Sequence, residues 1–236
     1  MLRNSVFTGE LQSSAFVGTQ SDTLYTNVHL GLDYPLIAWH PTETQRYDFG
    51  VYAFTHLHTQ PRNAKFYVSD LYAGFGIFFS GKVLEWFYWR LFPIYHVSSH
   101  IADGYQGNFE TDIHGVSNEM VRAEVVTAPV AGLQVGLAGG VYYHTVHRTD
   151  LDGVMELSAM YIPPLRCMVK PYAKVLGELI VQYENDPGVD LSVGALLSGV
   201  SGRSVCAGFR YYNRPHPGYF ALDYQSGYGL EIILSL

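Results

Sequence analysis

The sequence predicts an all-β chain that forms an antiparallel up-and-down transmembrane β-barrel of about twelve strands. Three observations predict this fold. Apolar side chains recur at every second position, the alternating segments are longer than most soluble strands, and aromatic residues are abundant while charged ones are few. The chain has 236 residues with 19 Tyr, 13 Phe and 24 Gly, and its charged share is 15%. We expect one domain covering residues 1–236.

The alternation is clearest in the segment 168–182. Val169, Val175 and Val181 fall on one side, and Lys170 and Lys174 fall on the other. A membrane-spanning strand needs about nine to eleven residues, whereas soluble strands average five or six. The segment is therefore long enough to cross a membrane. The other alternating segments are 5–17, 24–34, 46–58, 65–80, 83–100, 118–127, 131–147, 153–162, 189–199, 203–213 and 227–236.

The connections between these segments fall into two classes. One rim is expected to carry the long connections 101–117 and 214–226, and the other carries mostly short turns such as 81–82. The segment 35–45, which holds two prolines, is the exception. Long loops on one rim and short turns on the other are typical of outer-membrane barrels. A soluble β-sandwich would also alternate, but strand length, the even strand number and the loop asymmetry favour the membrane barrel.

The ends of the chain and its charge indicate location and partners. The last segment alternates to Leu236 and is similar to the C-terminal signal read by the bacterial barrel-assembly machinery, although the usual final residue is Phe. The first twenty residues lack the apolar run of a signal peptide, so we expect a mature form. We expect both termini to be periplasmic in the outer membrane of a diderm bacterium, with its lipids and the assembly machinery as partners. A net charge of -7 argues against nucleic acid.

The polar face of the alternating segments is expected to line the barrel interior. Its charged residues carry both signs: Glu10, Asp48, Asp70, Arg90, Arg122, Glu124, Glu156, Lys170, Lys174, Glu178, Arg210 and Glu231. Bulky aromatic residues share this face: Tyr25, Trp86, Tyr88, Tyr142, Tyr172 and Tyr212. A barrel of about twelve strands is intermediate between filled barrels and open porins. The bulk of these side chains therefore predicts a narrow or closed bore.

The most unusual segment is 90–105, and it contains Tyr-His-x-Ser-Ser-His-x-x-Asp from Tyr95 to Asp103. This pattern resembles the signature of a bacterial family of outer-membrane β-barrels, domain-of-unknown-function family 1207. Weaker similarity extends to Asp70 and to the segment 211–220. Where the family tends to read Gly-Asp-Glu after the second His, this chain has Ala-Asp-Gly at 102–104. The resemblance implies an outer-membrane location and no particular activity.

Unbroken alternation from Arg90 places His96, Ser98 and His100 in the interior, and Tyr95 and Val97 toward lipid. A structural hydrogen-bonding cluster that ties the loop 101–117 to the barrel would follow. The members of this cluster are Arg90, His96, Ser98, Ser99, His100, Asp103 and Asp70. The first hypothesis is accordingly non-enzymatic: a narrow channel or a surface-exposed structural barrel.

The second hypothesis is a lipid acyl hydrolase, so the question of enzyme activity stays open. Residues two apart on a strand point the same way, and Ser98 would be the nucleophile with His96 as its base. The pair resembles the His-x-Ser of outer-membrane phospholipases and lipid A deacylases. Asp103, Glu110 or a polar residue of a neighbouring strand would orient His96. A bulge near Pro93 would be needed to turn the pair toward the membrane.

The third hypothesis is a metal site at one mouth of the barrel. His56, His58, His100 and His144, together with His96 and Asp103, are expected near the same ends of their segments. Imidazoles are the commonest ligands for Zn²⁺ and similar divalent ions. Apart from such an ion, the sequence predicts no cofactor, and it gives no oligomeric state.

Overall fold

The computed structural model describes residues 8–18, 24–62, 65–101, 115–146, 151–182, 186–198, 204–215 and 224–235. Within these ranges the chain is built from strands joined by turns, and none of it forms a helix with the length and apolar character needed to cross a bilayer. The strands are β1 (Thr8–Gly18), β2 (Leu24–Trp39), β3 (Arg46–Arg62), β4 (Lys65–Leu84), β5 (Phe87–Ile101), β6 (Gly115–Val130), β7 (Leu133–Val146), β8 (Leu151–Tyr161), β9 (Val169–Gln182), β10 (Asp186–Ser198), β11 (Ser204–Pro215) and β12 (Tyr224–Ser235).

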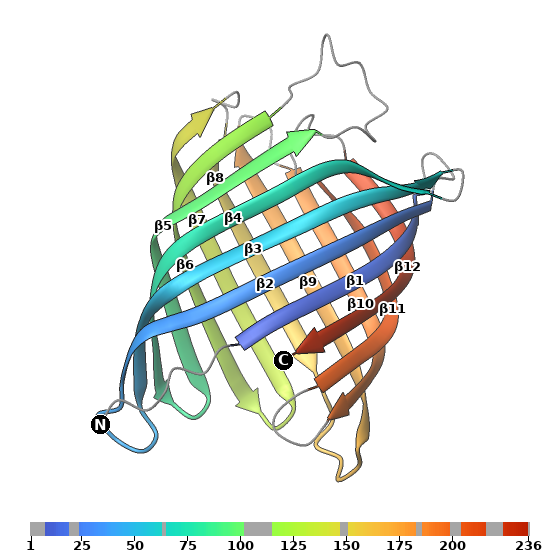
Figure 1. Cartoon of the computed structure of the whole chain (residues 1–236). Helices are drawn as coiled ribbons and strands as arrows, with labels where there is room; N and C mark the ends of the chain where they lie inside the picture. Colours follow the sequence, from blue (N-terminus) through green and yellow to red (C-terminus); the bar gives the residue numbers. More distant parts are fainter. Residues whose placement is uncertain are drawn as a thin grey trace.

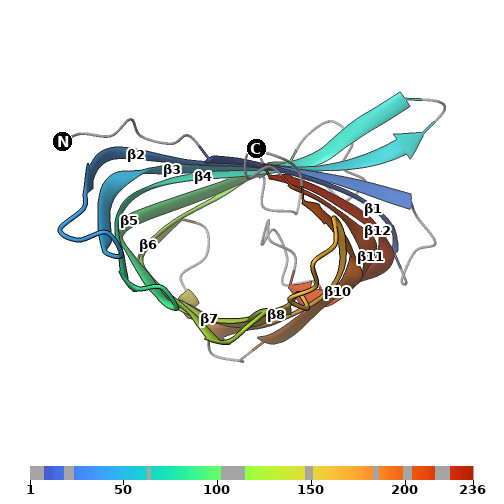
Figure 2. The ribbon, with the colours of Figure 1, turned by 90° about the horizontal axis from the view of Figure 1, so that it is seen from below.

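Each strand pairs antiparallel with its neighbours in the chain, and β1 also pairs with β12, so the strand order is that of a closed barrel. The strands are inclined to the barrel axis (Figure 1), and the ring is flattened when seen from below (Figure 2). The predicted all-β, antiparallel, up-and-down architecture is confirmed. Each predicted segment matches one strand, except that 83–100 also includes the last two residues of β4.

Two predicted connections are placed differently in the structure. Residues 81–82 lie inside β4, because the turn to β5 is formed by Glu85 and Trp86. Trp86 is therefore at the rim and 52% exposed, and its predicted interior position is wrong. The segment 35–39 continues β2 through an irregularity of register between Pro35 and Ile37, which shortens the connection to 40–45. The residue without a register partner is Leu36, directly after Pro35, and proline in a strand is typically found at or beside such irregularities.

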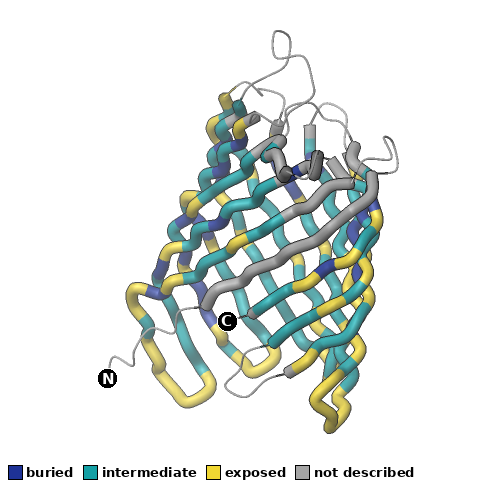
Figure 3. The backbone as a smooth tube through the Cα atoms, turned by 45° about the vertical axis from the view of Figure 1, so that its right-hand side comes forward, coloured by how far each residue is buried: buried dark blue, intermediate teal, exposed yellow. Residues whose placement is uncertain are grey.

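Apolar side chains cover the outer face of the barrel wall. Along the strands exposed positions alternate with less exposed ones (Figure 3). The exposed large apolar residues include Phe75, Phe79, Leu91, Ile94, Val121, Leu137, Val141, Leu157, Val193, Phe209 and Leu230. Charged side chains occupy the alternate positions, for example Glu156 beside Leu157 and Glu231 beside Leu230. This arrangement is the reverse of a soluble protein, whose apolar side chains turn inward.

A β-bulge interrupts β5 at Pro93. Between Phe92 and Tyr95, β5 advances by three residues while β6 advances by two, from Arg122 to Met120. The pairing with β4 shifts over the same segment of β5. Proline has no backbone N–H, so a position outside the hydrogen-bond ladder suits it. The extra residue reverses the faces of every later position in the strand.

Interior side chains of β5 are consequently even-numbered before the bulge and odd-numbered after it. The Tyr95 ring lies 5.2 Å from the buried Phe92 ring, and Val97 and Ser99 are 3% and 2% exposed. The prediction assumed unbroken alternation. Its assignment of faces is therefore wrong for Tyr95, Val97, His96, Ser98 and His100.

The turn between β6 and β7 depends on Gly132, which has φ of 84°. A Cβ atom there would lie 2.2 Å from the backbone oxygen of Ile162, whose N–H donates to the Gly132 carbonyl at 2.8 Å. We expect Gly132→Ala to lower the free energy of unfolding in detergent micelles by about 1–3 kcal/mol, measured by urea titration. Gly177→Ala is the control, since its Cβ would lie 3.9 Å from the Leu157 oxygen. Equal stability of the two variants would contradict the strain at Gly132.

Candidate functional site

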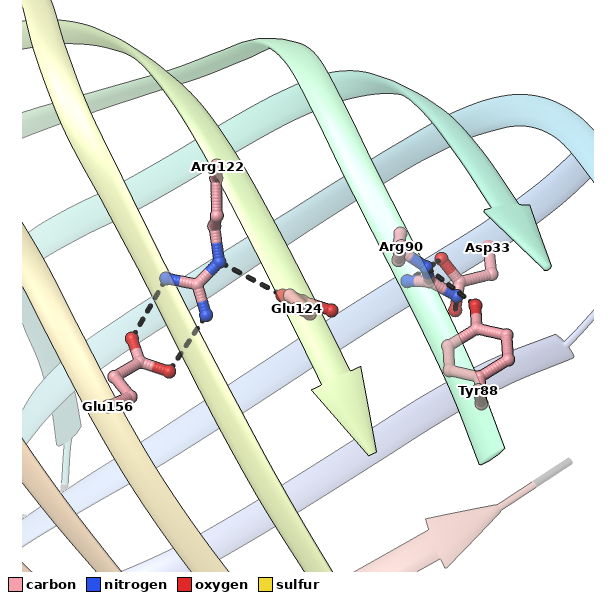
Figure 4. A network of polar contacts seen from close by, with 6 residues as sticks. All are labelled: Asp33, Tyr88, Arg90, Arg122, Glu124 and Glu156. Atoms are coloured by element: carbon pink, nitrogen blue, oxygen red, sulfur yellow. Dashed lines mark hydrogen bonds and ion pairs between the residues drawn. The ribbon is translucent and has the colours of Figure 1, made fainter. Parts of the chain in front are cut away.

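The barrel interior holds a charged contact between two distant strands. The guanidinium of Arg90 on β5 donates to both carboxylate oxygens of Asp33 on β2, at 3.0 and 3.1 Å (Figure 4). Its Nε donates to the Tyr88 hydroxyl at 2.9 Å. β3 and β4 lie between β2 and β5 in the sheet, so the two side chains meet across the inside of the barrel.

A second arginine joins β6 to β8. Arg122 donates to both oxygens of Glu156 at 3.0 and 2.8 Å, and its Nε donates to Glu124 at 2.9 Å (Figure 4). The contact passes over β7, where Gly140 is the register partner of Arg122. A Cβ at Gly140 would lie 2.6 Å from the sulfur of Met120 and 3.5 Å from the Arg122 Cβ. Bidentate contacts of this kind fix both the distance and the orientation of the two side chains.

A third arginine contact lies on the opposite part of the wall. Arg210 on β11 donates to the Asp190 carboxylate of β10 and to Glu231 of β12, the latter at 3.2 Å. Tyr172 on β9 donates to the other oxygen of Glu231 at 3.5 Å. Asp190 and Glu231 are 6% and 2% exposed. One guanidinium thus contacts two buried carboxylates and compensates their charge in part.

Aromatic side chains fill the interior between the Arg90 and Arg122 contacts. The Tyr95 ring lies 6.1 Å from Tyr52 and from Phe54. The Arg122 guanidinium lies 5.6 Å from the Tyr95 ring, and the Arg90 guanidinium lies 4.7 Å from the Phe78 ring. These distances are within the range of cation–π attraction. The aromatic layer therefore connects the two arginine contacts.

The predicted structural cluster does not form as a unit. Arg90 lies inside the barrel with Asp33, whereas His96 and Ser98 lie on the outer face beyond the bulge. Ser99 is buried on the inner side of the wall. Asp103 is outside the described residues, and so is the side chain of Asp70. The interior charges nevertheless follow the predicted polar face, because Arg90, Arg122, Glu124, Glu156, Arg210 and Glu231 all take part in these contacts.

The predicted metal ligands are not brought together. His56 lies inside the barrel, with its ring 6.0 Å from that of His29, while His144 and His100 are on the outer face. The side chain of His58 is not among those that the structure describes. Among the described residues, no group of three His, Cys, Asp or Glu is arranged to hold a metal ion. The convergence of these histidines at one mouth was expected from unbroken alternation, and the register shifts in β5 and β7 prevent it.

The outer face instead carries a cluster in which Glu119, a residue not singled out from the sequence, lies between two histidines. Glu119 on β6 is the register partner of His96 and also of His144 on β7. One carboxylate oxygen of Glu119 lies 3.6 Å from His96 Nδ1, and the other lies 3.8 Å from His144 Nδ1. His144 reaches this face because a register shift follows Tyr142, which pairs with the buried Met120. We call Ser98, His96, Glu119 and His144 the outer cluster.

Glu119, Asp33 and Asp190 were missed as site residues. Asp33 is 57 residues before Arg90 in the sequence, so nothing local links the two. Asp190 is 20 residues before Arg210 and was not among the charged residues predicted for the interior. Glu119 has a signal in the register, since it lies directly opposite His96. That signal becomes readable only once the bulge at Pro93 is known.

Comparison with known proteins supports the fold. The β domain of the Bordetella autotransporter BrkA aligns over 99% of both chains with a TM-score of 0.59 and 11% identity. The transport unit of the autotransporter AIDA-I from Escherichia coli covers 98% of this chain and 90% of its own at TM-score 0.49 and 10% identity. OmpT, an outer-membrane protein of Vibrio cholerae, covers 99% of both at TM-score 0.46 and 10% identity. Of these three, the BrkA domain alone exceeds 0.5, and at this identity it establishes the barrel fold and nothing more.

No protein-family model and no curated protein sequence matches the chain. The resemblance of the segment 95–103 to family 1207 therefore stays a prediction.

Removing an interior arginine tests the energetic role of these contacts. We expect Arg122→Ala to lower the free energy of unfolding by about 2–4 kcal/mol, because it leaves Glu124 and Glu156 without their common partner. Urea unfolding in micelles, followed by tryptophan fluorescence, measures the change. Arg46→Ala is the control. Its contact with Asp48 on the same strand is more exposed, so the loss should stay below about 1 kcal/mol.

Proposed function

We propose that the chain is a closed, twelve-stranded outer-membrane β-barrel of a diderm bacterium whose interior blocks general diffusion, and that it works as a narrow channel or a surface-exposed structural barrel. Both termini are periplasmic in this proposal, and the connections 101–117 and 214–226 face the cell surface. Membrane lipids surround the wall, and the barrel-assembly machinery inserts it.

The outer wall supports the membrane location. Large apolar side chains are exposed at successive outward positions, and in water such a surface would be unfavourable at about 25 cal/mol per Å². Aromatic residues mark the rim at the β2–β3 and β4–β5 turns. Trp39 and Trp86 are 63% and 52% exposed, and the Trp39 ring lies 5.6 Å from that of Tyr47. Aromatic girdles of this kind are typical of the two interfaces of a membrane barrel.

The ion pairs and aromatic side chains of the interior support a narrow or closed bore. Arg90 and Arg122 make ionic contacts with strands that are not their neighbours, and the aromatic layer fills the space between them. Arg210 makes its contacts with the two strands beside its own. A solute passing this level would have to separate two bidentate ion pairs whose arginine side chains are only 16% and 11% exposed. Charge pairs partly shielded from water attract more strongly than pairs in bulk solvent.

A charge on the outer wall tests the membrane location. Leu137 on β7 is 53% exposed and is paired in register with Leu157, which is 59% exposed. We expect Leu137→Lys to destabilise the barrel in lipid vesicles by about 2–4 kcal/mol, since a lysine near the middle of the bilayer loses its hydration. The control is Thr42→Lys in the exposed β2–β3 turn, where no loss is expected. A Leu137→Lys protein that remains stable and dissolves without detergent would refute the membrane barrel.

Conductance tests the closed interior. In planar bilayers the protein should give small steps or none, whereas the double variant Arg122→Ser and Glu156→Ser should give larger steps because the contact over β7 is removed. Leu137→Ala on the outer wall is the control and should conduct like the unmodified protein. Stable porin-sized steps from the unmodified protein would overturn the proposal.

A further inference from the structure

We propose that the outer cluster is a hydrolytic site in which Ser98 is the nucleophile, His96 is its base and Glu119 positions His96, and that the site cleaves acyl esters of membrane lipids. This inference goes beyond a non-enzymatic barrel. It stands on three features of the wall: the face to which the pair points, the carboxylate beside His96, and the depth of the cluster.

The bulge at Pro93 turns the pair outward. Val97 and Ser99 on either side of Ser98 are 3% and 2% exposed on the inner side of the wall. The outward direction of His96 is confirmed by its ring contact, at 5.1 Å, with Phe75, which is 54% exposed on β4. Ser98 follows two residues later on the same face. The bulge near Pro93 that a lipid hydrolase would need in order to turn Ser98 and His96 outward is therefore present.

The carboxylate of Glu119 is placed to orient the imidazole. Its oxygen lies 3.6 Å from His96 Nδ1, so a proton on Nδ1 leaves Nε2 as the basic nitrogen. Contacts of this length are common in catalytic sites before substrate binds. The second oxygen lies 3.8 Å from His144 Nδ1, which holds the carboxylate between two rings. A serine, a base and an orienting acid are thus present on two adjacent strands.

The depth of the cluster matches the ester region of a lipid. Ile94 and Val121, the outward positions below His96 and Glu119, are 41% and 44% exposed and apolar, whereas Ser98 and Ser117, the next outward positions above them on the same two strands, are polar. His96 also lies ten residues after Trp86. Because the bulge takes up one of these residues, about nine steps of about 3.3 Å at a tilt of about 40° correspond to about 23 Å along the membrane normal, close to the height of an apolar band of about 25 Å. The cluster therefore lies at the boundary where acyl chains meet their head groups.

The chemistry follows the general scheme of serine hydrolases. The Ser98 oxygen attacks the ester carbonyl carbon, and its proton passes to His96 Nε2. The ester C–O bond then breaks, and the leaving alkoxide takes that proton to depart as the deacylated lipid. Water attacks the acyl-serine, which releases a fatty acid and restores Ser98. Atoms balance with water as the co-reactant.

Fatty-acid release from the full-length, detergent-folded protein tests the proposal. The protein is mixed, in buffer containing Ca²⁺, with micelles of phosphatidylethanolamine and phosphatidylglycerol in one arm and of lipid A in the other, so that the arms separate the two sources of acyl ester. A lipophilic fluorophosphonate, mapped by mass spectrometry, reports an activated serine independently of the lipid. We expect release in one arm or both, and labelling at Ser98.

Two variants make the result specific. Ser98→Ala should lower release at least about 1,000-fold and abolish labelling, while the matched control Ser99→Ala, whose hydroxyl is on the inner side, should retain both. Glu119→Gln should lower kcat at least about tenfold with little change in KM, and Glu119→Asp should restore part of it. Migration of unheated samples on gels verifies that each variant is folded.

The proposal is overturned if the unmodified protein releases no fatty acid in either arm and Ser98 is not labelled, or if Ser98→Ala releases fatty acid at the unmodified rate. Neither result bears on the conductance or on the effect of Leu137→Lys, so the barrel proposal stands or falls separately.

Discussion

A chain surrounded by hydrocarbon must pair its own backbone N–H and C=O groups, and this constraint underlies every other feature of the barrel. Antiparallel pairing from β1 through β12 and back to β1 meets it. Once all strands are paired, side chains alone decide what faces lipid and what faces the interior. The period of two then places apolar residues on the outer face and charged residues on the inner face. Because unpaired charge is costly there, Arg90, Arg122 and Arg210 each form ion pairs with carboxylates inside the ring.

Most of the fold could be predicted from the sequence because alternation is a local signal. The segment 168–182 and the strand β9, Val169–Gln182, agree almost residue for residue. Alternation alone does not show where an extra residue exchanges the inner and outer positions of a strand. One extra residue at Pro93 reverses the faces of the later part of β5, and a proline within an alternating run was the available sign of it.

The site was harder to predict than the fold for the same reason. The residues of the segment 95–100 were identified, but their face was inverted. The partners Asp33 and Glu119 are contributed by other strands, so only the register across the sheet brings them to Arg90 and His96. The presence of ion pairs inside the barrel, in contrast, could be predicted, since the inner face carries charged residues of both signs and these pair with one another.

The arginine contacts also have a mechanical consequence. Arg90 joins β5 to β2 and Arg122 joins β6 to β8, so each fixes the separation of strands that share no backbone hydrogen bonds. Cross-links of this kind resist changes in the curvature of the wall. The flattened cross-section of the ring (Figure 2) is thereby braced at these two places.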